Sequence, residues 1–362
     1  MTRIIVFGAT GYTGDLTARS LVRQGIRPVL VGRNPARIEA LAAELGDLEW
    51  GVADVADPAS IRRHLSAGDV LISTVGPFLK FGTPAVQAAA EAGAHYFDST
   101  GEGPFIRDVF DRWGPVAAAN GAALLPAFGF DFVPGALAAG LALREAPEAT
   151  DIEIAYFPTD MNTSGGSRAS VIRVMLEEGY GFSAGRIAPE RPGSHLGRFE
   201  LNGKRRSAIS VPAAEQLSLP QSYPQLQRIR VHLGVPGVGA RIVHALSPAA
   251  FAALRFRRLR EGVVSISDRL LKGSTGGPDE LSRSTSTSFA IAQAQSNTGD
   301  LLATVTLAGA DPYDFTADIL AWGARAAADG QLKGVGALGP IAGFGLDPLQ
   351  DGCARAGLAP VA

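Results

Sequence analysis

The chain has 362 residues, more than one hydrophobic core usually organises, so we expect two domains. Hydrophobic residues make up 46% and charged residues 19% of the sequence, which excludes a disordered or fibrous protein. The net charge of −2, from 33 basic and 35 acidic residues, gives no basic excess that would draw the protein to nucleic acid.

Short β-branched runs alternate with helical patterns through the first 147 residues. Strands are expected at 3–7, 28–31, 48–52, 69–74, 96–98 and 122–127, with helices between them. Asn34-Pro35, Asp57-Pro58 and Thr83-Pro84 each place a capping residue before a proline at the start of a helical pattern. This alternation implies parallel crossovers, so the expected fold class is α/β with a doubly wound parallel sheet.

The pattern changes after residue 147. Residues 151–157 alternate like a strand with one solvated face, and 281–295 and 301–309 predict two strands joined by a turn at 297–300. Residues 168–178 and 313–328 have helical patterns. We therefore expect a second, α+β domain with an antiparallel sheet over residues 148–336.

A glycine-rich segment follows the first strand and opens the first helix: Gly8-Ala9-Thr10-Gly11-Tyr12-Thr13-Gly14. In this context Gly8 permits a tight turn, Gly11 lets the backbone approach a pyrophosphate, and Gly14 lets helix and strand pack closely. The helix N-terminus then offers N–H groups and a positive dipole end to the phosphates. A structural glycine turn is the alternative, but the strand, the helix and their position together favour a dinucleotide-binding Rossmann domain.

The second strand ends in Val31-Gly32-Arg33-Asn34, without the acidic residue that commonly binds the ribose 2′-hydroxyl of NAD. Arg33 can instead pair with a 2′-phosphate and stack on adenine, so NADP is favoured over NAD, with Asn34 beside it in the expected cofactor site. An exposed arginine on a helix-capping loop is the alternative. Asp54, after the third strand, is expected either to bind the adenine amino group or to form an Asx-turn.

The fourth strand runs into Ser73-Thr74-Val75-Gly76-Pro77, at the carboxyl edge where doubly wound sheets bind ligands. We expect this turn to lie against the nicotinamide ribose, with a plain loop as the alternative. Segments 95–102, 129–135 and 164–168 are expected at the same edge. The candidate catalytic side chains, which could move a proton or stabilise an enolate, are Tyr96, Asp98, Asp131, Arg168 and Tyr180.

A structural role is the alternative for each of these five side chains, and Asp131 could cap a helix that begins near Val133.

The sequence lacks the motifs of several other kinds of active site. No tyrosine has a lysine four positions on, no Gly-x-Ser-x-Gly occurs, and five scattered histidines and one cysteine give no metal-ligand spacing. The basic stretch 254–260 could dock an acidic carrier protein, coenzyme A phosphates or a lipid surface, or be a solvated helix face.

The sequence also carries signals about location. The single Cys353 favours a reducing, cytoplasmic compartment. The N-terminal residues run directly into a strand pattern without the features of a signal peptide. About 18 uninterrupted apolar residues would be needed for a membrane span, and the most apolar segment, 231–256, is broken by prolines and arginines, so no span is expected.

Several of these motifs together resemble the saccharopine dehydrogenase-like oxidoreductases, and most closely the branch of bacterial trans-acting enoyl reductases. They lie at 8–14, 31–33, 73–78, 96–102 and 129–134, with further similarity at 164–167 and 310–317. The resemblance implies a Rossmann domain, a second domain carrying the substrate site, and a C-terminal segment, 337–362, that returns to the first domain. It also implies NADP-linked reduction of C=N or C=C bonds.

The principal hypothesis is an NADPH-dependent reductase that transfers hydride to a C=C bond of a hydrophobic or acyl-type substrate, because the second domain is apolar and shows no basic cluster for an amino diacid. Imine reduction, as in saccharopine dehydrogenase-type amino-acid enzymes, is the alternative within this class. A non-catalytic NADP-binding sensor is the alternative outside it. The expected partner is a small-molecule substrate, which an acyl carrier could present; a homo-oligomer and a peripheral membrane contact stay open.

Overall fold

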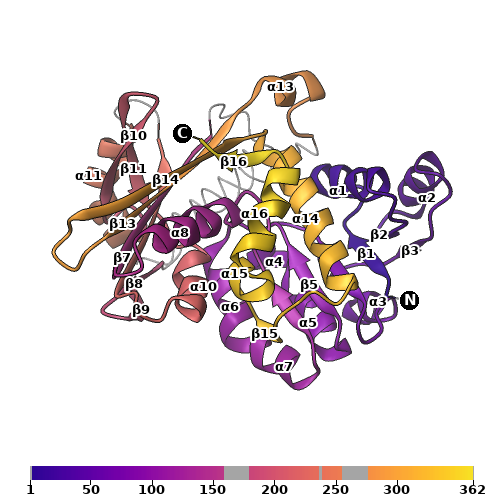
Figure 1. The fold of residues 1–362 in the computed structure, drawn as a ribbon. Coiled ribbons are helices and arrows are strands. Elements are labelled where there is room, and N and C mark those ends of the chain that lie inside the picture. The colour runs from indigo at the N-terminus through magenta and orange to yellow at the C-terminus, as the bar shows by residue number, and fades with distance from the viewer. Residues whose placement is uncertain (1, 159–178, 236–238, 255–275, 362) are drawn as a thin grey trace. The chain divides into compact units, whose positions relative to one another are not determined.

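The structure, a computed structural model, describes residues 2–158, 179–235, 239–254 and 276–361 (Figure 1). The chain forms two compact units. The first contains residues 1–100, 105–133 and 310–357, and the second contains 101–104, 134–309 and 358–362. These units differ from the sequence-based division at 147 and 336: the helix at 312–328 lies in the first unit and the strand at 358–360 lies in the second.

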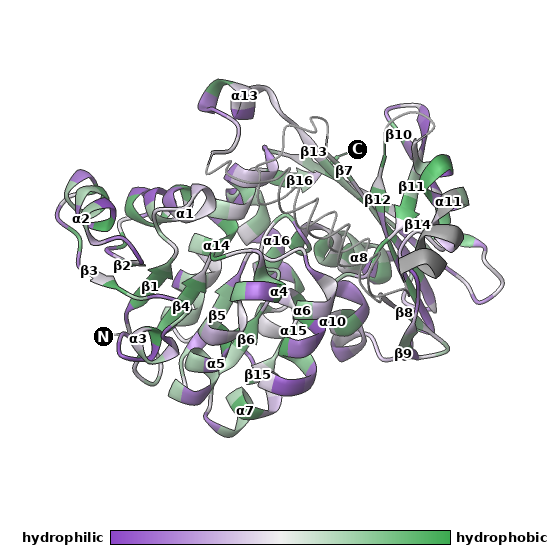
Figure 2. Cartoon of the chain, turned by 180° about the vertical axis from the view of Figure 1, so that it is seen from behind, coloured by the Kyte–Doolittle hydropathy of each residue, from purple (hydrophilic) through white to green (hydrophobic). Residues whose placement is uncertain are grey.

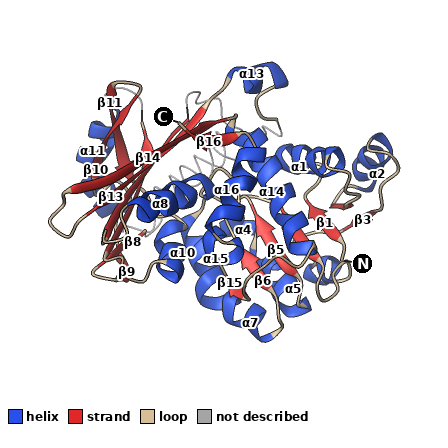
Figure 3. Ribbon diagram, viewed as in Figure 1, coloured by secondary structure: helices blue, strands red, loops and turns tan. Residues whose placement is uncertain are grey.

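The first unit is a parallel sheet whose strands alternate with helices along the chain (Figure 3). Its elements are β1 (Ile4–Phe7), α1 (Tyr12–Arg23), β2 (Val29–Gly32), α2 (Pro35–Glu44), β3 (Trp50–Val52), α3 (Pro58–Arg62), β4 (Val70–Ser73), α4 (Phe78–Phe81), α5 (Thr83–Ala92), β5 (His95–Asp98), α6 (Gly103–Asp108, which begins in the second unit), a π-helical turn (Val109–Trp113), α7 (Gly114–Ala119), β6 (Ala123–Leu125), α14 (Pro312–Ala328), β15 (Gly336–Ala337), α15 (Pro340–Phe344) and α16 (Leu346–Arg355).

Within the described residues the strand order of this sheet is β15-β6-β5-β4-β1-β2-β3, with every neighbouring pair parallel. The α/β doubly wound fold expected from the sequence is confirmed. The order reverses between β1 and β4. The carboxyl ends of strands at such a switch point are where doubly wound sheets bind their ligands.

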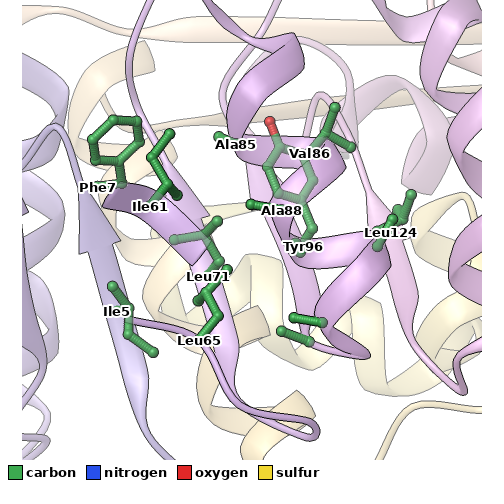
Figure 4. Close-up of a cluster of buried hydrophobic side chains, with 14 of the residues drawn as sticks. Ile5, Phe7, Ile61, Leu65, Leu71, Ala85, Val86, Ala88, Tyr96 and Leu124 are labelled. Carbon is green, nitrogen blue, oxygen red and sulfur yellow. The ribbon is translucent and has the colours of Figure 1, made fainter. Parts of the chain in front are cut away.

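Alternating side chains of the strands enter different parts of the core. Ile5, Phe7, Leu71 and Tyr96 join one buried cluster with residues of α3 and α5 (Figure 4). Phe97, the next residue along β5, instead packs on the rings of Phe128, on the loop after β6, and Phe344 of α15. The green strands at the centre of Figure 2 show how apolar this sheet is. Strands buried on both faces read as continuous apolar runs, which is typical of a parallel sheet.

The second unit is built on a mainly antiparallel sheet. Its elements are α8 (Val133–Glu145, whose first residue lies in the first unit), β7 (Asp151–Pro158), β8 (Tyr180–Ser183), β9 (Arg186–Pro189), β10 (Leu196–Leu201), β11 (Lys204–Ser210), α10 (Glu215–Ser222), β12 (Arg228–Gly234), α11 (Gly239–Leu254), α13 (Glu280–Thr285), β13 (Ser288–Gln295), β14 (Leu301–Gly309) and β16 (Leu358–Pro360). Among the described residues the main strand order is β10-β11-β12-β7-β13-β14-β16, with β8 and β9 attached to β12.

This α+β unit agrees with the expected fold class, with two differences. The central pair β7 and β12 is parallel, so the sheet is mixed. The prediction of a strand over 281–295 was wrong for its first third, which belongs to the short helix α13. Asp279 caps this helix by accepting a hydrogen bond from Ser282 N at 2.9 Å. The hairpin of β13 and β14 is present as expected.

Candidate functional site

The glycine segment forms a tight loop between β1 and α1. Gly8 has φ +89°, a conformation that L side chains rarely adopt. A Cβ on Gly8 would also lie 2.7 Å from Val75 Cγ2. A Cβ on Gly14 would collide with the Gly8 carbonyl oxygen and lie 2.8 Å from Thr74 Oγ1. The loop therefore requires glycine at the turn and at the helix–strand contact, the two roles that the sequence predicted for these positions.

Gly11 differs from its two neighbours in the motif. It is the N-cap of α1 with φ −82°, it is exposed, and its Cβ would meet only the Gly8 carbonyl oxygen, at 3.2 Å. Packing therefore demands glycine less strictly here than at Gly8 and Gly14, and the absence of a side chain leaves the backbone open to a ligand. As Gly11 has no side chain to accept from the first N–H groups of α1, the positive end of the helix is open to an anion.

The loop between β4 and α4 packs against the glycine segment. Thr74 Oγ1 donates to the carbonyl oxygens of Phe7 and Gly8, at 3.2 and 3.3 Å, so the loop is fastened to the glycine turn. Val75 touches the same turn, while Gly76 is exposed and Pro77 partly exposed. The structure thus brings Thr74 and Val75 together with Gly8 and Gly14, and the contact of Gly76 and Pro77 with the cofactor stays a prediction.

Two side chains flank the loop beyond β2. Arg33 is exposed, and Arg37 Nη2 lies 3.5 Å from the Thr10 carbonyl oxygen. Asn34 caps α2 by accepting from Arg37 N at 3.1 Å, which confirms its expected cap. An exposed guanidinium beside a glycine loop fits a ribose 2′-phosphate, because arginine presents a planar fork of donors to such a group.

Asp54 forms the turn that the sequence analysis gave as its alternative. Its Oδ1 accepts from Ala56 N at 2.9 Å, and its own N–H donates to Ser60 Oγ at 2.9 Å. The side chain stays partly exposed, so one carboxylate oxygen is engaged in the turn. Its expected contact with adenine stays a prediction.

Three polar side chains of β4 and β5 are buried inside the first unit: Ser73, Tyr96 and Asp98. Figure 4 shows Tyr96 among apolar side chains that include Val86 and Leu124. Burial, and then the nearby Asp98 carboxylate, raise the pKa of the Tyr96 hydroxyl well above the usual range of tyrosine, so it stays protonated. The Ser73 hydroxyl lowers that pKa, but by less than burial and Asp98 raise it. The Tyr96 hydroxyl forms no hydrogen bond of normal geometry with Ser73 or Asp98.

Asp98 anchors two loops at the carboxyl edge of the sheet. Its Oδ1 accepts from Thr100 N at 2.9 Å and from Ala127 N at 2.8 Å. Since Asp98 is fully buried, these bonds stabilise a carboxylate that would be costly to bury alone. The structure gives Asp98 this positioning role, and catalysis by Asp98 or Tyr96 stays a prediction.

Asp131 stands on the loop that follows β6, and it keeps an exposed surface while its neighbours Phe130 and Phe132 are buried. Desolvation by the surrounding protein raises the pKa of its carboxyl to about 6. An accessible carboxyl that titrates near neutrality suits general acid–base chemistry.

The other candidates lie in the second unit or outside the description. Tyr180 is buried, and its hydroxyl donates to the carbonyl oxygens of Ala213, at 3.0 Å, and Gly103, at 3.3 Å. Its hydroxyl therefore ties three segments of the unit together. Arg168 and residues 255–260 of the basic stretch lie outside the described residues.

A buried polar group of the second unit was missed by the sequence reasoning. Tyr156 OH donates to Glu215 Oε1 at 2.5 Å and accepts from Gly135 N at 2.8 Å. All three residues are buried, and a Cβ on Gly135 would collide with the tyrosine hydroxyl. No local signal pairs these positions, because they are brought together from α8, β7 and α10.

The described residues contain no group of three or more His, Cys, Asp or Glu side chains that could hold a metal ion. Within the same residues, no helix is both long and apolar enough to cross a membrane.

A family model for the saccharopine dehydrogenase NADP binding domain matches residues 4–118. Over these residues the chain is similar to the NADP-binding domain of the saccharopine dehydrogenases. This agrees with the exposed Gly11 and Arg33, and with the preference for NADP that the sequence indicated.

Curated relatives match over a longer part of the chain. A trans-acting enoyl reductase from Mycobacterium ulcerans is 38% identical over 184 residues, which cover 48% of this chain and 44% of the relative. A putative trans-acting enoyl reductase from Mycobacterium tuberculosis is 37% identical over 183 residues, with the same coverage. The match thus spans less than half the length of these curated relatives.

The whole fold has a counterpart among solved structures. The apo saccharopine dehydrogenase (L-Glu forming) of Saccharomyces cerevisiae matches all of this chain and all of its own, with a TM-score of 0.61 and 13% identity. At that identity the likeness concerns the fold alone, which it extends to both units. The family model supports NADP as the cofactor of the matched residues.

Proposed function

We propose that the protein is an NADPH-dependent reductase that adds hydrogen across a C=C bond conjugated to a carbonyl group, in a hydrophobic or acyl-type substrate. The glycine loop carries the proposal, because its one exposed glycine, Gly11, stands at an open helix N-terminus in a domain of the NADP-binding family. The names of the curated relatives support an enoyl substrate.

The cofactor contacts follow from the exposed groups of the first unit. Backbone N–H groups at the start of α1 would bind the pyrophosphate, and Arg33 would pair with the 2′-phosphate. Residues 74–77, fastened to the glycine turn, would border the nicotinamide ribose. NADPH bound in this way supplies a hydride for the β-carbon of the substrate.

Asp131 is the side chain that we propose as proton donor. In its protonated form it would give a proton to the α-carbon, so that hydride and proton together saturate the double bond. The pKa of about 6 leaves a fraction of the carboxyl protonated near neutral pH. The acid form is present below that pKa and is lost as the pH rises through it. The rate should therefore fall about tenfold per pH unit above roughly pH 6 to 7.

The test is oxidation of NADPH, followed by its absorbance, with an α,β-unsaturated acyl thioester as acceptor and a cyclic imine as comparison. We expect turnover with the thioester and a decline of kcat/KM above about pH 6. Asp131→Asn should lower kcat by about 100-fold or more and remove that decline. Asp351→Asn, an exposed aspartate of α16, is the matched control and should behave like the unchanged protein.

Each contrary result has a distinct meaning. Turnover of the imine alone would replace the C=C substrate by a C=N substrate. Tight NADPH binding without turnover of either acceptor would favour the non-catalytic sensor. An Asp131→Asn variant that keeps the full rate and the same pH dependence would remove this residue from the mechanism.

A further inference from the structure

The first turn of α14 contacts two loops of the first unit that are distant from it in sequence. Tyr313 packs edge-on against Tyr12 of the glycine loop, with ring centroids 5.1 Å apart. One turn later, Thr316 Oγ1 accepts from Phe130 N at 3.0 Å. The same turn therefore lies beside the nucleotide loop and beside the loop that carries Asp131.

The contact at Thr316 is buried and close. The Thr316 side chain is only 8% exposed, and its hydroxyl proton is directed to the Pro312 carbonyl oxygen at 2.6 Å, which leaves a lone pair for the Phe130 N–H. A Cβ on Gly129 would lie 2.9 Å from Thr316 Cγ2. The backbone at 129–130 thus rests directly on this threonine.

The other end of the same loop is fixed by β5. Asp98 Oδ1 accepts from Ala127 N, and the Asp98 carbonyl oxygen accepts from Phe128 N at 2.7 Å. Phe132 N then donates to the Ala127 carbonyl oxygen at 2.9 Å, which closes the loop on itself. Asp131 is the residue between these fixed points, so its direction is set by the anchors on either side.

We propose that Thr316 is a positioning residue for Asp131: its hydroxyl holds the Phe130 amide, and with it the direction in which the Asp131 carboxyl points. The inference rests on the proposed function, in which Asp131 donates the proton. The geometry is independent of that function, because the hydrogen bonds hold the loop whatever the carboxyl does.

Removal of the hydroxyl should release the loop. The Thr316→Val substitution keeps the shape of the side chain but removes the acceptor of the buried Phe130 N–H. The unpaired N–H then lowers its free energy by moving to where it can bond to water. The carboxyl of Asp131 then becomes better hydrated, so its pKa should fall toward the ordinary value of aspartate. A fall of about one unit would cut the protonated fraction near neutral pH about tenfold.

The first measurement needs no substrate. Selective ¹³C labelling of aspartate allows the carboxyl of Asp131 to be titrated by NMR, with Asp131→Asn to assign its signal. We expect a pKa about one unit lower in Thr316→Val and a nearly unchanged pKa in Thr316→Ser, which keeps the hydroxyl. Thr17→Val is the matched control, because Thr17 is buried in α1 and its hydroxyl donates to the Thr13 carbonyl oxygen in the same way.

The same samples are then assayed for NADPH oxidation. Thr316→Val should lose about tenfold in kcat at neutral pH, with its pH profile displaced to lower pH, and Thr316→Ser should recover both. If the pKa of Asp131 is the same in Thr316→Val as in the unchanged protein, or falls equally in Thr17→Val, the positioning role is refuted. If the pKa shifts as expected but Asp131→Asn is fully active, the positioning stands and the proposed acid is wrong.

Hydrogen exchange tests the contact without any substitution. If Thr316 holds the Phe130 amide, that amide should exchange as slowly as the Val133 amide, which bonds to the Gly129 carbonyl oxygen at 3.0 Å in the same loop. Fast exchange at Phe130 beside slow exchange at Val133 would overturn the inference.

Discussion

Two glycines of the nucleotide loop should respond differently to the same added methyl group. In Gly14→Ala the new Cβ meets the backbone of Gly8, at 2.8 Å from its carbonyl carbon, and Thr74 Oγ1 at 2.8 Å. The Gly8 backbone cannot move without displacing the end of β1, and the Thr74 hydroxyl can move only by giving up its bonds to the Phe7 and Gly8 carbonyl oxygens, so we expect a loss of about 1–3 kcal/mol in the free energy of unfolding. NADPH binding should weaken as well, because α1 is displaced from the loop.

In Gly11→Ala the methyl group meets only the Gly8 carbonyl oxygen at 3.2 Å. The unfolding free energy should change by less than about 1 kcal/mol, as for an ordinary N-cap exchange. The methyl group nevertheless stands where the phosphate should approach. Loss of one charge-assisted hydrogen bond, about 1.5–3 kcal/mol, would raise the Kd for NADPH roughly 10- to 150-fold.

Urea unfolding and calorimetric titration with NADPH distinguish the two variants. Gly276→Ala is the control, since no atom of the described residues lies within 4 Å of a Cβ there. The reasoning is refuted if Gly11→Ala binds NADPH with the native Kd, or if it loses as much stability as Gly14→Ala.

Three further substitutions test single side chains. Arg33→Ala should raise the Kd for NADPH about tenfold and leave that for NADH unchanged, and equal effects on both in a calorimetric titration would contradict the phosphate contact. Tyr156→Phe removes the hydroxyl between Glu215 and Gly135 N, so urea unfolding should show a loss of about 2–3 kcal/mol, and a neutral result would show that the group adds nothing. Tyr96→Phe should keep stability within about 1 kcal/mol, because its hydroxyl makes no well-formed bond; a larger loss would disprove this.

Local signals were sufficient for the first six strands of the parallel sheet. The glycine loop was recognisable because Gly8 and Gly14 are required within the loop itself, as the φ of Gly8 and the contact of Gly14 with the Gly8 carbonyl show. The cap at Asn34 was equally local, since the side chain bonds to a backbone N–H three residues later. Such features depend on neighbours in the chain, and a single sequence displays them directly.

The remaining features depend on partners that are distant in sequence. Nothing near Thr316 indicates that its hydroxyl receives the Phe130 amide, which is 186 residues away. The pair Tyr156 and Glu215 is separated by 59 residues and joins a strand to a helix. Asp98 looked like a catalytic acid in the sequence, and only the fold shows that its carboxylate holds the Thr100 and Ala127 amides.

The completion of the first unit by residues 310–357 has a consequence for its biosynthesis. β15 adds to the sheet beside β6, and Trp322 of α14 packs on Phe344 of α15, 4.9 Å between ring centroids, on the side of β5 where Phe97 lies. Translation must pass through the second unit before these pieces emerge. At about 5–20 residues per second, the interval from residue 133 to residue 357 is roughly 10–45 s.

During that interval the nascent chain holds a sheet whose β5 and β6 lack their aromatic cover. Exposed apolar strands of this kind bind chaperones or aggregate. The ribosome-bound intermediate should therefore be more prone to aggregation than the finished protein. A fragment cut to residues 4–118, the region of the family match, would also lack β6 and would leave β5 uncovered permanently. Nucleotide binding would then appear late in synthesis, after residues 310–357 have left the ribosome.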